Sequence, residues 1–188
     1  MLPVYLKLGF DHISDLKGYD HILFIIALCA SYSISDWRRI LILVTAFTLG
    51  HSFTLALSAL HIVNLPTGLI EFLIPCTILC TALLNIWYKP VPSQTWSPVY
   101  LLALFFGFIH GLGFASYFKA LLGKEASIIG PLLGFNLGVE LGQLCIVASI
   151  LLLNFIFIRV GKISQRQWNI PVSVIAAAIA LVMIFERI

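Results

Sequence analysis

Charged residues are scarce in this sequence. Of its 188 residues, 11 are Lys or Arg and 8 are Asp or Glu, together 10%, against about 25% in a typical soluble domain. Hydrophobic residues make up 61%, and the mean hydropathy is +1.05. Because so few charges cannot cover the surface of a 20.9 kDa globule in water, a water-soluble fold is excluded. The net charge of +3 forms no basic stripe, which excludes a nucleic-acid-binding protein.

Cysteines are also few, and their placement excludes a disulfide scaffold. Cys29, Cys76, Cys80 and Cys145 all lie inside apolar runs, where a free cysteine behaves as a small buried hydrophobe. Cys76 and Cys80 are four residues apart and could bind a soft cation such as Cu(I), but simple packing is the favoured explanation. The sequence also lacks the Gly-x-x-x-x-Gly-Lys-Ser/Thr loop that binds nucleotide phosphates.

Long apolar runs are abundant instead. About 20 apolar residues in a helix cross the ~30 Å hydrocarbon core of a bilayer. The runs predict an all-α polytopic transmembrane helix bundle, formed as a single integral membrane domain over residues 1–188. We expect an interfacial segment at 1–17 and six spans, near 18–34, 40–63, 68–88, 100–118, 129–160 and 171–185.

The charges between the spans predict an orientation. With six spans, both termini lie on one side of the membrane. The connections on the other side carry six Lys and Arg, against five on the side of the termini. Since Lys and Arg favour the cytoplasmic side, we expect both termini to lie outside the cytoplasm.

Several ionisable residues fall inside the predicted spans, where each central charge costs about 2.5–3.5 kcal/mol. Successive spans run in opposite directions, so the position of a residue along its span gives its depth in the membrane. By this measure, the ionisable residues lie in one half of the bilayer. If the helices turn these faces inward, they form one pocket, and the candidate metal ligands are His21, His51, His110, Asp20, Glu140 and Glu71. Imidazole and carboxylate groups are ligands for Zn, Ni, Co, Fe or Cu(II).

Each candidate also has a simpler interpretation. An isolated intramembrane histidine such as His51 or His110 can simply bond to backbone or a hydroxyl group. Asp20 could cap a helix N-terminus, and Glu71 lies close enough to the interface to reach water. His61, near the end of its span, is expected to take no part.

Polar companions and small residues accompany the candidate ligands. In the fifth span, Asn136, Glu140 and Gln143 are spaced to share one helical face. Thr48 and Ser52 share a face with His51 and could orient its ring, as outer residues do around a metal. Glycines that allow close helix approach recur at Gly130, Gly134, Gly138 and Gly142, and again at Gly107 and Gly111.

Four segments resemble the HupE/UreJ membrane proteins, and in particular the second branch of that family. They are Gly9-Phe10-Asp11-His12 through Gly18-Tyr19-Asp20-His21-Ile22-Leu23-Phe24, Phe47-Thr48-x-Gly50-His51-Ser52-x-Thr54-Leu55, Gly107-Phe108-Ile109-His110-Gly111-x-Gly113-Phe114-Ala115, and Phe135-Asn136-x-Gly138-Val139-Glu140-x-Gly142-Gln143-Leu144. The resemblance implies a multi-pass protein of the bacterial inner membrane, related to nickel or cobalt permeases, and it adds His12 to the candidate ligands. Two features depart from the permease pattern: the spacing from His12 to Asp20 is longer, and no acid follows His110 in its span.

Two functions of different classes fit these residues. The first is transport of a divalent transition-metal ion (Ni, Co, Zn or Cu) by exchange of its water for histidine and carboxylate ligands. The alternative is an intramembrane zinc hydrolase acting on a lipid, in which Asp20 or Glu140 serves as general base. A closed metal site with an accessory role is a third interpretation. The expected partners are the lipid bilayer and the metal ion, and a homo-oligomer is left open.

Overall fold

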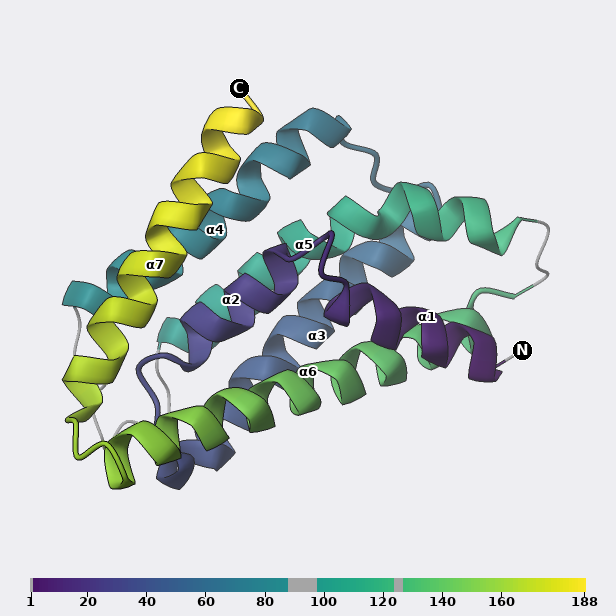
Figure 1. Cartoon of the computed structure of the whole chain (residues 1–188). Helices are drawn as coiled ribbons and strands as arrows, with labels where there is room; N and C mark the ends of the chain where they lie inside the picture. Colours follow the sequence, from purple (N-terminus) through teal and green to yellow (C-terminus); the bar gives the residue numbers. More distant parts are fainter. Residues whose placement is uncertain (1, 88–97, 124–126) are drawn as a thin grey trace.

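The computed structural model describes residues 2–87, 98–123 and 127–188, and these residues are helical throughout apart from short connections (Figure 1). The elements are α1 (Leu2–Ser14), α2 (Asp20–Cys29), the short 3-10 helix η1 (Ile34–Asp36), α3 (Trp37–Ala59), α4 (Thr67–Trp87), α5 (Pro98–Leu122), α6 (Ile129–Arg159) and α7 (Gln165–Glu186). The described residues contain no strand, so the predicted all-α bundle is confirmed.

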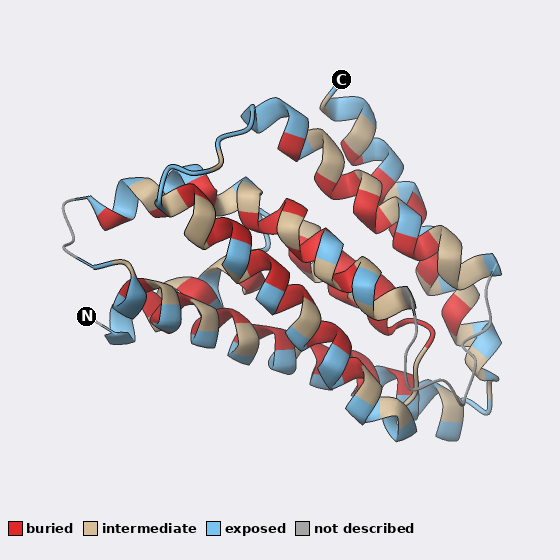
Figure 2. Cartoon of the chain, turned by 180° about the vertical axis from the view of Figure 1, so that it is seen from behind, coloured by how far each residue is buried: buried red, intermediate tan, exposed pale blue. Residues whose placement is uncertain are grey.

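Five helices, α3 to α7, are long and apolar enough to cross a membrane. Their outward faces carry large apolar side chains such as Leu49 and Phe53, which are 62% and 56% exposed, while the buried faces turn toward one another (Figure 2). This arrangement suits a hydrocarbon solvent and would be unstable in water. The chain is therefore a helical membrane protein, and four of the five helices match predicted spans closely. Residue 88, where the third predicted span ends, lies outside the described residues.

The last helix begins six residues before its predicted start at residue 171. Ser164 forms a capping box with Gln167, because the Ser164 hydroxyl accepts from the Gln167 amide at 3.2 Å and the Gln167 side chain accepts from the Ser164 amide at 2.7 Å. These bonds satisfy donors at the helix start. Pro171 lies inside the resulting helix, so the proline does not mark its beginning.

The first predicted span, residues 18–34, differs most from the structure. Its helix, α2, has only 10 residues and is about 15 Å long at 1.5 Å per residue, which is too short to cross the ~30 Å core. Within the expected interfacial segment at 1–17, Leu2–Ser14 form α1, which packs along the first half of α6, with Leu2 beside Gly134 and Ile13 beside Gly142.

Helices α1 and α2 together follow the path of one span. The N-terminus of α1 lies at the end of the bundle where α6 begins, and α2 continues toward the opposite end (Figure 1). There, the Asn85 side chain donates to the carbonyl oxygen of Ala27 at 2.5 Å, and the Gln165 side chain donates to those of Ala30 and Tyr32 at 3.1 and 3.0 Å. These amides satisfy carbonyls that a helix end inside a membrane protein would otherwise leave free.

Glycines bring two pairs of helices into backbone contact. A methyl group at Gly138 of α6 would overlap the carbonyl oxygen of Leu6 in α1, and one at Gly107 of α5 would overlap that of Phe47 in α3. The predicted close approach is therefore present at both glycine sets except at Gly130, which has no neighbour within 4 Å. The partners are α1 for the α6 glycines and α3 for the α5 glycines, and each contact holds a histidine-bearing helix in place.

Candidate metal centre

Four histidines from four helices meet in the middle of the bundle. His12 lies near the end of α1, His21 at the start of α2, His51 within α3 and His110 within α5. One ligand atom each from His12, His21 and His51 lie within 4.8 Å of one another. The ring centroid of His110 is 5.0 Å from that of His21.

These rings are removed from solvent, yet several of their nitrogens have no hydrogen-bond partner. His51 and His110 are fully buried, and His21 is 4% exposed. The unpartnered buried atoms are His12 Nε2, His21 Nε2, His51 Nδ1 and Nε2, and His110 Nδ1. A buried polar atom without a partner costs about 1–3 kcal/mol, so four such side chains at one place indicate a site for a ligand.

The Asp20 carboxylate fixes the tautomer of His21. Its Oδ1 atom accepts from His21 Nδ1 at 2.9 Å and from the His21 backbone amide, also at 2.9 Å. With the ring proton on Nδ1, the lone pair of Nε2 is free. A histidine that ligates a metal through one nitrogen while a carboxylate holds the other is the usual arrangement in metal sites.

The Thr77 hydroxyl of α4 fixes the tautomer of His110 in a similar way. The Thr77 hydroxyl donates to the carbonyl oxygen of Ile74 at 2.7 Å, and the same oxygen lies 3.0 Å from His110 Nε2. Because the only hydroxyl proton is already committed, His110 Nε2 is the donor in this contact. The lone pair of a neutral His110 is therefore on Nδ1, the atom without a partner.

The donor set fits a transition-metal ion. Nitrogens bound to one tetrahedral zinc ion at about 2.0–2.1 Å lie about 3.4 Å apart. The ligand atoms of His12, His21 and His51 lie within 4.8 Å of one another, so these three rings would move together by at most about 1.4 Å to hold one ion. Neutral imidazoles suit Zn, Ni, Co and Cu(II). The nearby Asp20 carboxylate, 15% exposed, partly offsets the charge of a bound cation.

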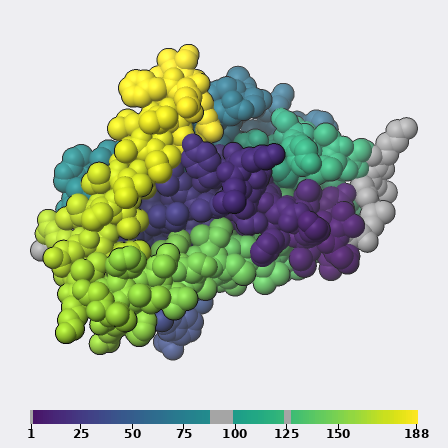
Figure 3. All heavy atoms as spheres, in the orientation of Figure 1, coloured from purple at the N-terminus to yellow at the C-terminus, as the bar shows by residue number. Residues whose placement is uncertain are grey.

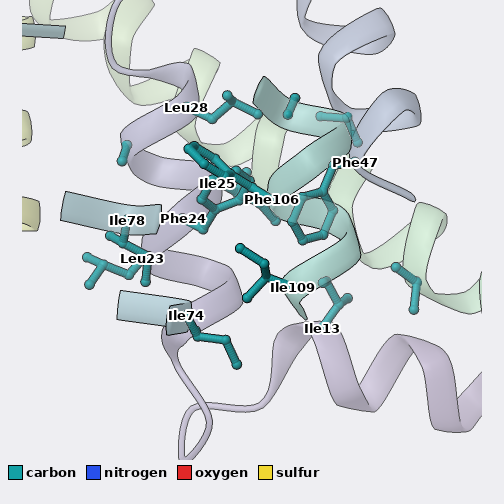
Figure 4. Close-up of a cluster of buried hydrophobic side chains, with 14 of the residues drawn as sticks. Ile13, Leu23, Phe24, Ile25, Leu28, Phe47, Ile74, Ile78, Phe106 and Ile109 are labelled. Carbon is teal, nitrogen blue, oxygen red and sulfur yellow. The ribbon is translucent and has the colours of Figure 1, made fainter. Parts of the chain in front are cut away.

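An aromatic layer closes the bundle on the side of the cluster toward the start of α3. Phe47 and Phe106 each precede a cluster histidine by one helical turn, and Phe24 follows His21 by nearly one turn. Phe24 stacks on Phe47 at 4.9 Å and meets Phe106 edge-on at 6.1 Å (Figure 4). We call these three residues the first aromatic layer.

A second aromatic layer lies on the opposite side of the histidines. It consists of Phe114 and Phe118 of α5 and Phe135 of α6. Phe114 stacks on Phe135 at 4.9 Å, and Phe118 lies 5.4 Å from Phe135. The His12 ring is 3.9 Å from that of Phe114, and the His51 ring is stacked 6.1 Å from that of Phe135. The cluster is thus enclosed along the bundle axis in both directions.

The predicted acids Glu71 and Glu140 lie apart from this cluster. The Glu71 side chain is exposed, and its backbone carbonyl accepts from Arg187 at 2.5 Å. That carbonyl needs an outside donor because Pro75, four residues on, has no amide hydrogen. Glu140 accepts from Thr45 at 3.3 Å, on the contact between α3 and α6.

The predicted polar companions contact one another more than they contact the His51 ring. Thr48 donates to Gln143 at 2.7 Å, and Ser52 donates to the carbonyl oxygen of Thr48 at 2.6 Å. The Oδ1 atom of Asn136 is buried without a partner. No described hydrogen bond joins either hydroxyl to His51, so Thr48 and Gln143 instead link α3 to α6.

Sequence reasoning did not identify Thr77 or the two aromatic layers. A threonine in an apolar helix usually bonds to its own backbone, as Thr77 also does, so its type carries no signal. Phe24, Phe47, Phe106 and Phe114 each lie about one turn from a cluster histidine, and that regular spacing is the signal available in the sequence. Phe118 and Phe135 carry no such signal.

The fold and the cluster define a class: a polytopic helical membrane protein with histidines gathered at the centre of its bundle. Within that class, the family model described as HupE / UreJ protein matches residues 1–187, so the chain belongs to the HupE/UreJ family. The resemblance found in the sequence motifs is confirmed, and the family is associated with nickel and cobalt transport. Neither the curated proteins nor the solved structures contain a match.

Proposed function

We propose that this protein carries a divalent transition-metal ion of the nickel and cobalt class across the bacterial inner membrane. In this proposal, His12, His21, His51 and His110 bind the ion, Asp20 and Thr77 orient two of the rings, and both termini lie outside the cytoplasm. The observation that carries it is the set of four imidazoles from four helices, each with a buried nitrogen that has no hydrogen-bond partner.

The position of the cluster favours transport over storage. His51 and His110 lie near the middle of α3 and α5, at the depth where a permeating ion is furthest from water. The first and second aromatic layers enclose the ion along the bundle axis, as expected for a carrier that never opens a continuous pore. Neutral imidazoles bind an ion firmly enough to replace its water and release it more readily than a thiolate site does.

The hydrolase alternative has less support. A zinc hydrolase needs a carboxylate free to take a proton from the metal-bound water. Asp20 is committed to the ring of His21, and Glu140 bonds to Thr45 on the contact between α3 and α6. Neither acid is positioned as a general base, so the geometry supports the carrier.

Reconstituted vesicles test the proposal. We expect the purified protein to move nickel or cobalt into vesicles and His51→Ala to abolish that flux. The matched control is His61→Asn, because His61 is an exposed histidine with a φ of 60°, a backbone conformation that asparagine tolerates. Equal flux with the two variants would overturn the proposal. Tightly held metal without flux, together with turnover of membrane lipid, would favour the hydrolase.

A further inference from the structure

The outer face of the break between α1 and α2 carries charges at a depth where the other helices present hydrocarbon. Lys7 pairs with Asp11 on α1, and their side chains are 75% and 55% exposed. Asp15 and Lys17, in the connection itself, are exposed as well. This connection lies on the face of the molecule that also shows α6 and α7 (Figure 3).

Packing contacts fix the depth of these charges. Residues 15–19 directly precede Asp20 and His21, and the His21 ring lies 5.0 Å from that of His110, near the middle of α5. Along α6, α1 has Leu2 beside Gly134 and Ile13 beside Gly142, so α1 ends beside the middle of α6. The break therefore lies near the bilayer midplane.

Neither the charges nor the backbone of the break suits contact with lipid. Charged side chains at this depth face protein or water rather than acyl chains. Non-helical backbone is tolerated there only where protein buries it or where it lines a water-filled space. Leu16, which lies between two charged residues, is 81% exposed and suits lipid. The charges of Asp15 and Lys17 are exposed in the single chain as well, and these two side chains require contact with something other than acyl chains.

The two aromatic layers around the histidine cluster favour water as the contact of the break between α1 and α2. Along the bundle axis, the first and second aromatic layers separate the cluster from both ends. Asp20 is the carboxylate bonded to a cluster histidine, and it remains 15% exposed, immediately beside the break. Asp20 thus lies between the enclosed histidine cluster and the exposed, charged connection at residues 15–19.

We propose that the break between α1 and α2 is a water-filled side opening through which cations reach the histidine cluster, past Asp15 and Asp20. This proposal rests on the metal-binding role given to the cluster above. The acidic side chains raise the local cation concentration, and the short α2 lets the route begin at mid-depth rather than at the end of the bundle.

Thiol labelling of the full-length protein in vesicles tests the opening without any metal. In a variant whose four native cysteines are replaced by alanine, we compare Lys17→Cys with Leu141→Cys. Leu141 is the control because it is 47% exposed on α6, next to Gly142 and therefore at a similar depth. A membrane-impermeant methanethiosulfonate should modify Cys at position 17 severalfold faster than at position 141, because the reagent needs an ionised thiol in water.

Two results would overturn the side opening. Equally slow labelling at both positions would show that lipid covers the break. Labelling of position 17 only after detergent separates copies of the chain, or a disulfide-linked dimer through that position, would show that a second copy covers it. Both results concern the opening alone, since nickel or cobalt flux is measured separately and reports on the cluster.

A second variant tests the route in the chain with its native cysteines. Asp15 accepts from the Lys17 amide at 2.8 Å, and Asp15→Asn keeps that acceptor while it removes the charge. We expect nickel uptake to slow severalfold at low ionic strength, the difference to vanish at high salt, and equilibrium nickel binding to stay unchanged. Uptake as fast as in the unmodified chain at low salt would contradict the route.

Discussion

The imidazoles of His21 and His110 are each held at one nitrogen and free at the other. The Asp20 carboxylate holds His21, and the Thr77 hydroxyl holds His110. Each contact keeps the lone pair on the nitrogen that has no hydrogen-bond partner, so the rings are prepared to bind a cation without a change of tautomer. Two substitutions test this account at the residue scale.

Asp20→Asn should weaken metal binding by about 10- to 100-fold, the usual cost of removing the residue that orients a ligand. The asparagine side chain is almost the same size, so the fold should persist. Titration of purified protein with nickel measures the dissociation constant. Asp11→Asn, which changes an exposed acid paired only with Lys7, is the control, and equal affinity in the two variants would refute the role of Asp20.

Thr77→Val should also weaken metal binding, by about tenfold or more, because it removes the acceptor for His110 Nε2. Thr77→Ser should restore it. Thr81→Val is the control, since Thr81 lies one turn further along α4 and its hydroxyl donates to the carbonyl oxygen of Thr77 at 2.9 Å. The same titration applies, and a loss with Thr81→Val as large as with Thr77→Val would mean that helix packing explains both.

The structure brings the predicted histidines together but leaves the predicted acids Glu71 and Glu140 apart from them, for a physical reason. Conversion of sequence position into depth predicts the level of a residue in the membrane but not the direction in which its helix is turned. His51 and His110 lie at the same depth, and their helices turn both side chains toward the cluster. Glu140 was predicted at a similar depth, but its side chain bonds to Thr45 instead. His12 joins the cluster despite its longer spacing from Asp20, because residues 15–19 form the connection between two helices.

At the scale of helices, the contact between α1 and α6 holds His12 in place. Gly138→Ala would push a methyl group into the Leu6 carbonyl and force the helices apart, at a cost of about 1–3 kcal/mol. We expect a lower unfolding temperature and weaker metal binding together. Gly130→Ala is the matched control on the same helix, because a methyl group there meets nothing within 4 Å.

The two glycine variants are compared by thermal unfolding in detergent and by nickel titration. If Gly138→Ala leaves both quantities at the level of Gly130→Ala, then α1 does not support the site. The sequence of residues 1–17 predicts an interfacial segment because Lys7 and Asp11 are typical of a surface helix. Only the glycines of α6 indicate a partner for this segment within the bundle.

At the scale of the whole molecule, composition predicted the class and hydropathy predicted most of the helices. The broken first span was not predictable in this way. A window of about 19 residues averages the ten-residue α2 with the apolar residues after it and reports one span. The break becomes visible only when Asp20 and His21 are seen to begin a helix beside the midpoints of α3 and α5.

In the proposed function, one metal ion binds to imidazoles contributed by α1, α2, α3 and α5. X-ray absorption at the edge of the bound metal, on purified full-length protein loaded with nickel or cobalt, tests it most directly. We expect a first shell rich in imidazole nitrogen, which is lost with the metal in His51→Ala and kept in His61→Asn. A first shell of oxygen or sulfur, or equal metal content in the two variants, would contradict it.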